Sequence, residues 1–148
     1  QRFIPQNSKV LFLHNTFASN DEIKQLATYF KESYFVLCPS SNLFIEGVLP
    51  DVPMLKGLGV NLALGTDSYS STDTISVFDQ MMIIIEKYPT LSFPDVLKWG
   101  TFSGAKALSF DSQVGSFEVG KQPGLNLITN FDFTLMKPTS NSKVKRLV

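Results

Sequence analysis

The sequence lacks a pair of cysteines, a long apolar segment and an excess of charge of either sign. Cys38 is its one cysteine, which excludes an internal disulfide framework. Its longest apolar run, residues 81–85, falls far short of the roughly 20 residues that span a bilayer. The 13 Lys and Arg residues equal the 13 Asp and Glu residues, and no Gly-rich phosphate loop is present. We therefore expect neither a nucleic acid nor a membrane as partner.

The remaining composition is typical of a globular domain. A length of 148 residues with 43% hydrophobic residues suffices for an ordinary core without metal or disulfide staples. The single cysteine fits a reducing compartment and predicts a cytoplasmic protein. The chain begins with Gln1 rather than Met, which indicates either processing or a piece of a longer chain.

The hydrophobic pattern predicts a succession of βα units. Residues 10–13, 34–37 and 60–64 are short apolar runs, typical of strands that are covered on both faces. Ser19 and Glu22 have the spacing of a capping box before a one-sided apolar stripe. The pattern indicates further helices over residues 52–58, 74–88, 92–99 and 103–108. Such spacing is typical of an α/β protein with a parallel sheet.

The last part of the sequence has a different character. From residue 114 onward, the signals are those of turns and strands, over residues 115–120, 125–128, 131–136 and 144–148. We expect a domain boundary within residues 109–113, which divides the chain into residues 1–110 and 111–148. The second part is expected to be a small, three-stranded β element that is not stable alone.

Polar residues follow each of the three predicted strands, at residues 14–16, 38–42 and 67–68. Because active residues gather at the carboxyl ends of parallel strands, this rim is the expected site. Taken singly, each residue also has a structural explanation: His14 could be a hydrogen-bonded structural residue, Asp67 could form a turn, and Asn42 could stabilise the loop. Cys38 is expected to be a small buried hydrophobic residue. Together, His14 and Asp67 could bind a metal and move protons, but they provide only half of a metal site.

Four stretches of the sequence form an ordered set of motifs: VLFLHNTFASNDEI, CPSSNLFI, GVNLALGTDS, and SGAKALSF followed by GSFEVGKQPGLNLI, which together cover about residues 9–130. In this order they resemble the C-terminal part of the amidohydrolase superfamily, in its cytosine, guanine and adenosylhomocysteine deaminase and chlorohydrolase branch. The resemblance implies the last three βα units, strands six to eight, of a (β/α)8 TIM-type barrel. C-terminal strands of a small β domain would follow.

The resemblance also implies roles for individual residues. Asp67 would be a metal ligand that takes a proton from the attacking water, and His14 would be catalytic and face the substrate. Asn42 and Ser68 are further candidate substrate contacts. The complete enzyme would carry zinc or iron, but the other ligands of the family have no match here. The chain alone is therefore expected to bind no metal and to be inactive.

The implied activity is metal-dependent hydrolysis of a C–N bond that removes an amine from a purine-type or pyrimidine-type heterocycle. Dechlorination and hydrolysis of a cyclic amide use the same residues, and a non-catalytic α/β interaction domain is a further alternative. The expected partners are a small-molecule substrate, a missing N-terminal part of the same chain, and further copies of the chain. Open strand edges predict that self-association.

Overall fold

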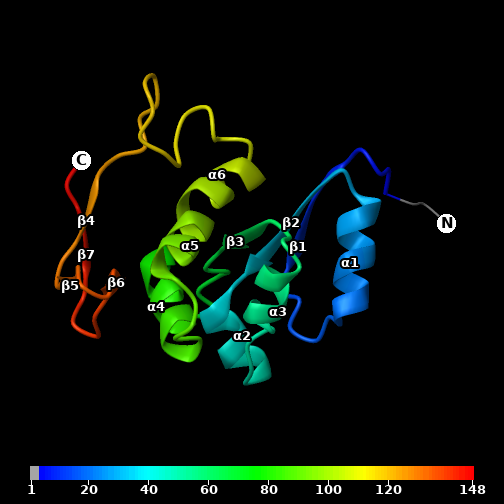
Figure 1. Ribbon diagram of the computed structural model, residues 1–148, viewed down its shortest axis with the longest axis horizontal. Helices are drawn as coiled ribbons and strands as arrows, with labels where there is room; N and C mark the ends of the chain where they lie inside the picture. Colours follow the sequence, from blue (N-terminus) through cyan, green and yellow to red (C-terminus); the bar gives the residue numbers. More distant parts are fainter. Residues whose placement is uncertain (1–3) are drawn as a thin grey trace.

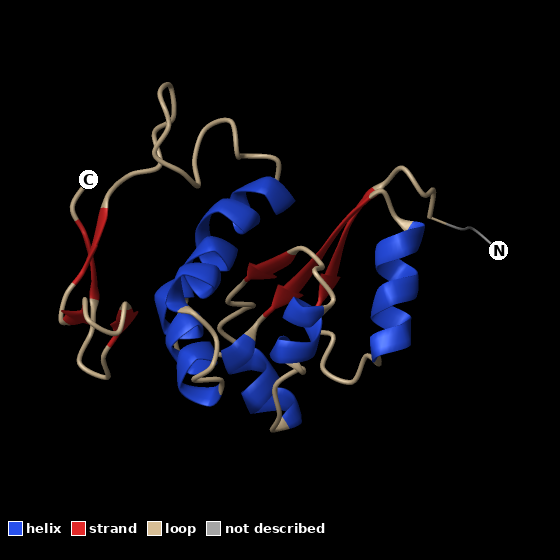
Figure 2. Cartoon of the chain, viewed as in Figure 1, coloured by secondary structure: helices blue, strands red, loops and turns tan. Residues whose placement is uncertain are grey.

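The computed structural model describes residues 4–148, so Gln1 lies outside the described residues (Figures 1 and 2). A three-stranded parallel sheet forms the centre of the fold, in the order β1-β2-β3. The strands are β1 (Lys9–Leu13), β2 (Glu32–Leu37) and β3 (Leu62–Leu64). The three predicted strands and their parallel arrangement are thereby confirmed.

Helices cover one face of this sheet. Phe35 and Leu64 on that face pack against apolar side chains from α1 (Asn20–Tyr29), α3 (Val52–Gly57), α4 (Val77–Lys87) and α5 (Phe93–Lys98). A π-helical turn, η1 (Trp99–Ser103), continues α5 into α6 (Gly104–Ala107). The opposite face of the sheet carries smaller buried side chains, namely Val36, Cys38 and Ala63.

Local capping explains where two of the helices begin. The predicted capping box of α1 is present, because Ser19 and Glu22 bond each other's backbone N–H reciprocally. The expected start of α4 near Thr74 is wrong by three residues. Ser76 accepts a hydrogen bond from the backbone of Asp79, so the helix begins at Val77. Ile75, expected in the buried stripe, therefore lies before the helix and is exposed.

Residues 39–46, which were expected to begin as a polar loop, instead form α2 (Pro39–Glu46). Proline is favoured in the first turn of a helix, where a missing N–H costs no intrahelical bond. The preceding residue, Cys38, makes no side-chain cap. Gln80 of α4, which is fully buried, provides the cap from outside: its Oε1 accepts from Ser40 N at 2.8 Å and its Nε2 donates to Ser40 Oγ at 2.9 Å.

The C-terminal part forms two separate antiparallel pairs, so the expected three-stranded element is wrong. β4 (Asn126–Ile128) pairs with β7 (Val144–Arg146), and β5 (Phe131–Asp132) pairs with β6 (Lys137–Pro138). The strand signal over residues 115–120 also gives no strand in the described structure, because Gly115 and Gly120 adopt turns with positive φ of 92° and 91°. Both pairs lie at one end of the molecule, beside α5 and α4 (Figure 1).

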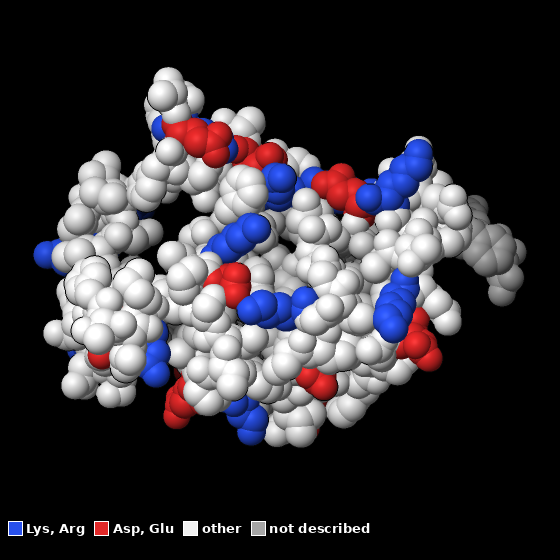
Figure 3. Space-filling view, in the orientation of Figure 1, with Lys and Arg blue, Asp and Glu red and all other residues white. Residues whose placement is uncertain are grey.

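Charged side chains of both signs are interspersed on the face seen in Figure 3. On this face, the distribution agrees with the equal numbers of basic and acidic residues in the sequence. Among the described residues, no helix has both the length and the apolar content that a bilayer crossing requires.

Candidate active site

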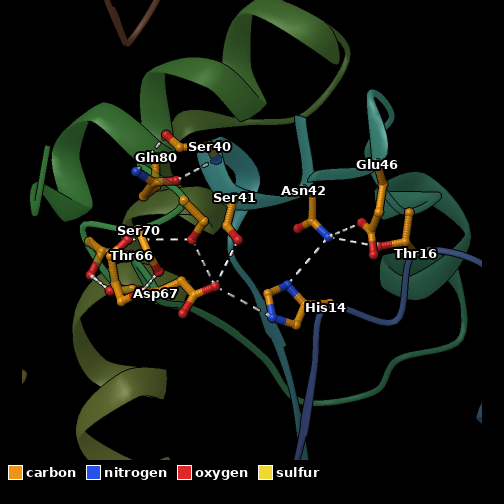
Figure 4. Close-up of polar contacts among 12 residues, drawn as sticks. His14, Thr16, Ser40, Ser41, Asn42, Glu46, Thr66, Asp67, Ser70 and Gln80 are labelled. Atoms are coloured by element: carbon orange, nitrogen blue, oxygen red, sulfur yellow. Dashed lines mark hydrogen bonds and ion pairs between the residues drawn. The ribbon is translucent and has the colours of Figure 1, made fainter. Parts of the chain in front are cut away.

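The backbone brings His14 and Asp67 to one rim of the sheet. His14 directly follows β1, and Asp67 follows β3 after two residues. Each adopts a left-handed conformation, with φ of 66° and 61° respectively. Such strain in residues other than glycine is uncommon and concentrates at functional sites. The two side chains point toward one another, with 3.7 Å between His14 Nε2 and Asp67 Oδ2 (Figure 4).

Asp67 is held by two hydroxyl groups. Its Oδ2 accepts from Ser41 Oγ of α2 at 2.7 Å and from Ser71 Oγ of the following loop at 3.1 Å. The Ser41 bond is the main cause that holds the pKa of Asp67 below its ordinary value, with further contributions from Ser71, the Ser68 backbone and His14. Asp67 is therefore an ionised carboxylate at neutral pH. Within residues 4–148, both side-chain bonds end on Oδ2, which leaves Oδ1 available for a ligand.

His14 is flanked on its other side by a buried amide. Asn42 Nδ2 lies 3.5 Å from His14 Nδ1, 2.7 Å from Thr16 Oγ1 and 2.9 Å from Glu46 Oε2 (Figure 4). Thr16 also donates to Glu46 Oε2 at 2.6 Å. This hydroxyl is the main cause that lowers the pKa of Glu46, and Asn42 adds to it. The imidazole thus lies between the carboxylate of Asp67 and the Asn42 amide.

The structure brings together three of the four predicted site residues: His14, Asn42 and Asp67. Ser68 is exposed, and its hydroxyl instead pairs with Ser70 Oγ at 2.6 Å. The sequence-based site omitted several residues of the same network, namely Thr16, Ser41, Glu46, Ser71 and Gln80. Ser41 and Thr16 lie within the polar clusters at the strand ends. Glu46 lies one helical turn after Asn42, a signal that exists only once α2 is known.

The described residues do not make a complete metal site. No three His, Cys, Asp or Glu side chains among them lie close enough together to hold a metal ion, whereas a catalytic zinc takes three protein ligands. Cys38 does not help, because burial raises the pKa of its thiol to about 11 and keeps it protonated. Asp67, with one uncommitted oxygen, fits a single ligand position. That the chain alone binds no zinc stays a prediction.

The chain is similar in sequence and in structure to known deaminases. The chain is 29% identical over 125 residues to an adenosine deaminase of Helicobacter pylori. This match spans 82% of the chain and 30% of that relative. A zinc-bound adenosine deaminase from Xanthomonas campestris superimposes with a TM-score of 0.70 at 30% identity, covering 84% of this chain and 30% of that one.

A guanine deaminase from C. acetobutylicum with bound guanine superimposes with a TM-score of 0.69 at 26% identity, covering 89% of this chain and 35% of that one. The chain thus spans about a third of the length of these relatives. The relatives confirm the resemblance seen in the ordered motifs. The amidohydrolase family model matches residues 2–146, so the chain belongs to the amidohydrolase family.

Proposed function

We propose that this chain forms the last three βα units of a (β/α)8 barrel in a metal-dependent amidohydrolase that removes an amine from a purine-type heterocycle. Residues 1–110 belong to that barrel, and residues 111–148 to a small β domain. The observation that carries the proposal is the pairing of His14 and Asp67 at the carboxyl ends of β1 and β3, each on left-handed backbone. Similarity to adenosine and guanine deaminases supports the substrate class.

The chemistry of the chain's own residues fits hydrolysis. Asp67 Oδ1 would hold one position on a divalent metal, which activates water in such enzymes. Since hydrogen bonds keep Asp67 ionised, it can accept the proton that an attacking water loses. His14 Nε2 lies on the same rim and can donate to or accept from the substrate. The other metal ligands would come from residues outside this sequence.

The test is an assay of the full-length protein against adenosine, guanine, a chlorinated triazine and a cyclic amide. Deamination of a purine is the expected result. Asp67→Asn and His14→Gln should each lower kcat/KM by at least about 100-fold, as loss of a general acid or base does. Asp21→Asn, an exposed carboxylate of α1, is the matched control and should leave the rate unchanged. Near-normal activity of Asp67→Asn would refute the proposal.

A further inference from the structure

The Asn42 side chain has an unusual imbalance of partners. Its nitrogen carries two N–H groups and lies 2.7 Å from Thr16 Oγ1, 2.9 Å from Glu46 Oε2 and 3.5 Å from His14 Nδ1. Its oxygen is buried and has no hydrogen-bond partner among the described residues. A buried carbonyl oxygen without a donor is destabilising, so something must favour this orientation of the amide over the inverted one.

Glu46 accounts for the orientation. An ionised carboxylate can only accept hydrogen bonds. In the inverted amide, Asn42 Oδ1 would take the place of Nδ2 and would lie 2.9 Å from Glu46 Oε2. The two oxygens would then repel each other, because neither carries a proton. Thr16 reinforces the same direction, because its hydroxyl donates to Glu46 and leaves its oxygen to accept from Asn42.

The orientation of the Asn42 amide determines whether His14 Nδ1 lies beside a donor or an acceptor. Thr16 Oγ1 and Glu46 Oε2 lie 2.6 Å apart and can share one N–H of Asn42 Nδ2. This leaves the second N–H for His14 Nδ1 at 3.5 Å. Because an amide nitrogen can only donate, Nδ1 is the acceptor of this pair. In a neutral imidazole, one nitrogen accepts and the other carries the proton. Nε2 then carries it, and Nε2 is the nitrogen on the side of Asp67. The main chain at His14 is anchored to β2, since His14 N donates to Val36 O at 2.9 Å.

We propose that Glu46 is a positioning residue: together with Thr16 it orients the Asn42 amide and thereby selects the form of His14 that is protonated on Nε2. The rim then offers a substrate an N–H donor beside the Asp67 carboxylate. The substrate atom that accepts this hydrogen bond would be a nitrogen of the heterocycle or its departing amine, and only this assignment rests on the proposed function. The hydrogen-bond geometry does not depend on it.

The test is nitrogen NMR of the full-length protein labelled with ¹⁵N-histidine, in which the His14 signals are those that His14→Gln removes. At about pH 9, above the range in which imidazoles titrate, we expect Nδ1 unprotonated and Nε2 protonated. Glu46→Gln can donate to Asn42 Oδ1 and so permits the inverted amide. It should raise the population protonated on Nδ1 several-fold. Glu86→Gln, which removes an exposed charge on α4, should leave the ratio unchanged.

A second variant keeps the inference falsifiable if Glu46→Gln does not fold. Thr16→Val retains the shape of the side chain and removes the hydroxyl, and it should shift the ratio in the same direction. Protonation on Nδ1 in the unaltered protein would overturn the inference, as would unchanged ratios in both variants. The NMR measurement needs no substrate, so its result is independent of the deaminase assay. Either proposal can therefore be refuted while the other holds.

Discussion

At the scale of single residues, the rim of the sheet combines two side chains at strand ends with a carboxylate on α2, which accepts a hydrogen bond from Thr16. His14 and Asp67 follow apolar runs, so their place at the rim follows from chain order. Their left-handed backbone left no sequence signal, because neither residue is glycine. Glu46 escaped prediction because its role depends on a hydroxyl 30 residues earlier in the chain.

Cys38 permits a prediction at this scale. Its thiol is 4% exposed, and burial raises its pKa to about 11. Because only the thiolate reacts with iodoacetamide, we expect native Cys38 to be alkylated at least about 100-fold more slowly at pH 8 than in the unfolded chain. Mass spectrometry of timed samples measures this rate. An added exposed thiol, Ser140→Cys, should react readily in the same native protein, and equal rates for Cys38 before and after unfolding would contradict the prediction.

At the scale of elements, helices with local signals were predictable and α2 was not. Ser19 with Glu22 and Ser92 with Asp95 cap α1 and α5 from within a few residues. The cap of α2 comes from Gln80, 40 residues along the chain, and Pro39 followed by two serines is typical of a loop. A helix that depends on such a distant partner cannot be found from a local pattern.

Gly100 permits a prediction about the π-helical turn η1. A Cβ at this position would collide with Met81 Cε and lie 2.9 Å from Val77 Cγ1, both on α4. Gly100→Ala should therefore lower the free energy of unfolding by about 1–3 kcal/mol through overpacking. Gly57→Ala in α3 is the control, because a Cβ there meets open space and a small gain is expected. Urea denaturation monitored by circular dichroism compares the two, and equal stabilities would refute the close packing.

At the scale of the whole molecule, the sheet ends abruptly on both sides. β1 and β3 are edge strands within the described residues, and each has one side without a strand partner. Leu13 at the end of β1 is 58% exposed, and Phe17, Phe44 and Tyr69 near the same rim are exposed as well. Open edges and apolar side chains favour association with further strands.

We therefore expect the 148-residue chain to self-associate. Sedimentation velocity should show species larger than a monomer that grow with protein concentration. Leu13→Lys places a charge at the open edge and should reduce this association. Leu135→Lys, an equally exposed position beyond β5, should have little effect. A monomer at every concentration would contradict the prediction.

The first turn of α2 has a consequence for insertions and deletions. Ser40, Ser41 and Asn42 are consecutive, yet they bond to α4, to the residue beyond β3 and to the residues beyond β1 respectively. Each added residue rotates the following helix positions by about 100°. Gaining or losing one residue just before Ser40 would turn all three side chains away from their partners at once, whereas a substitution removes the contacts of one side chain. The spacing of this turn is therefore as constrained as its chemistry.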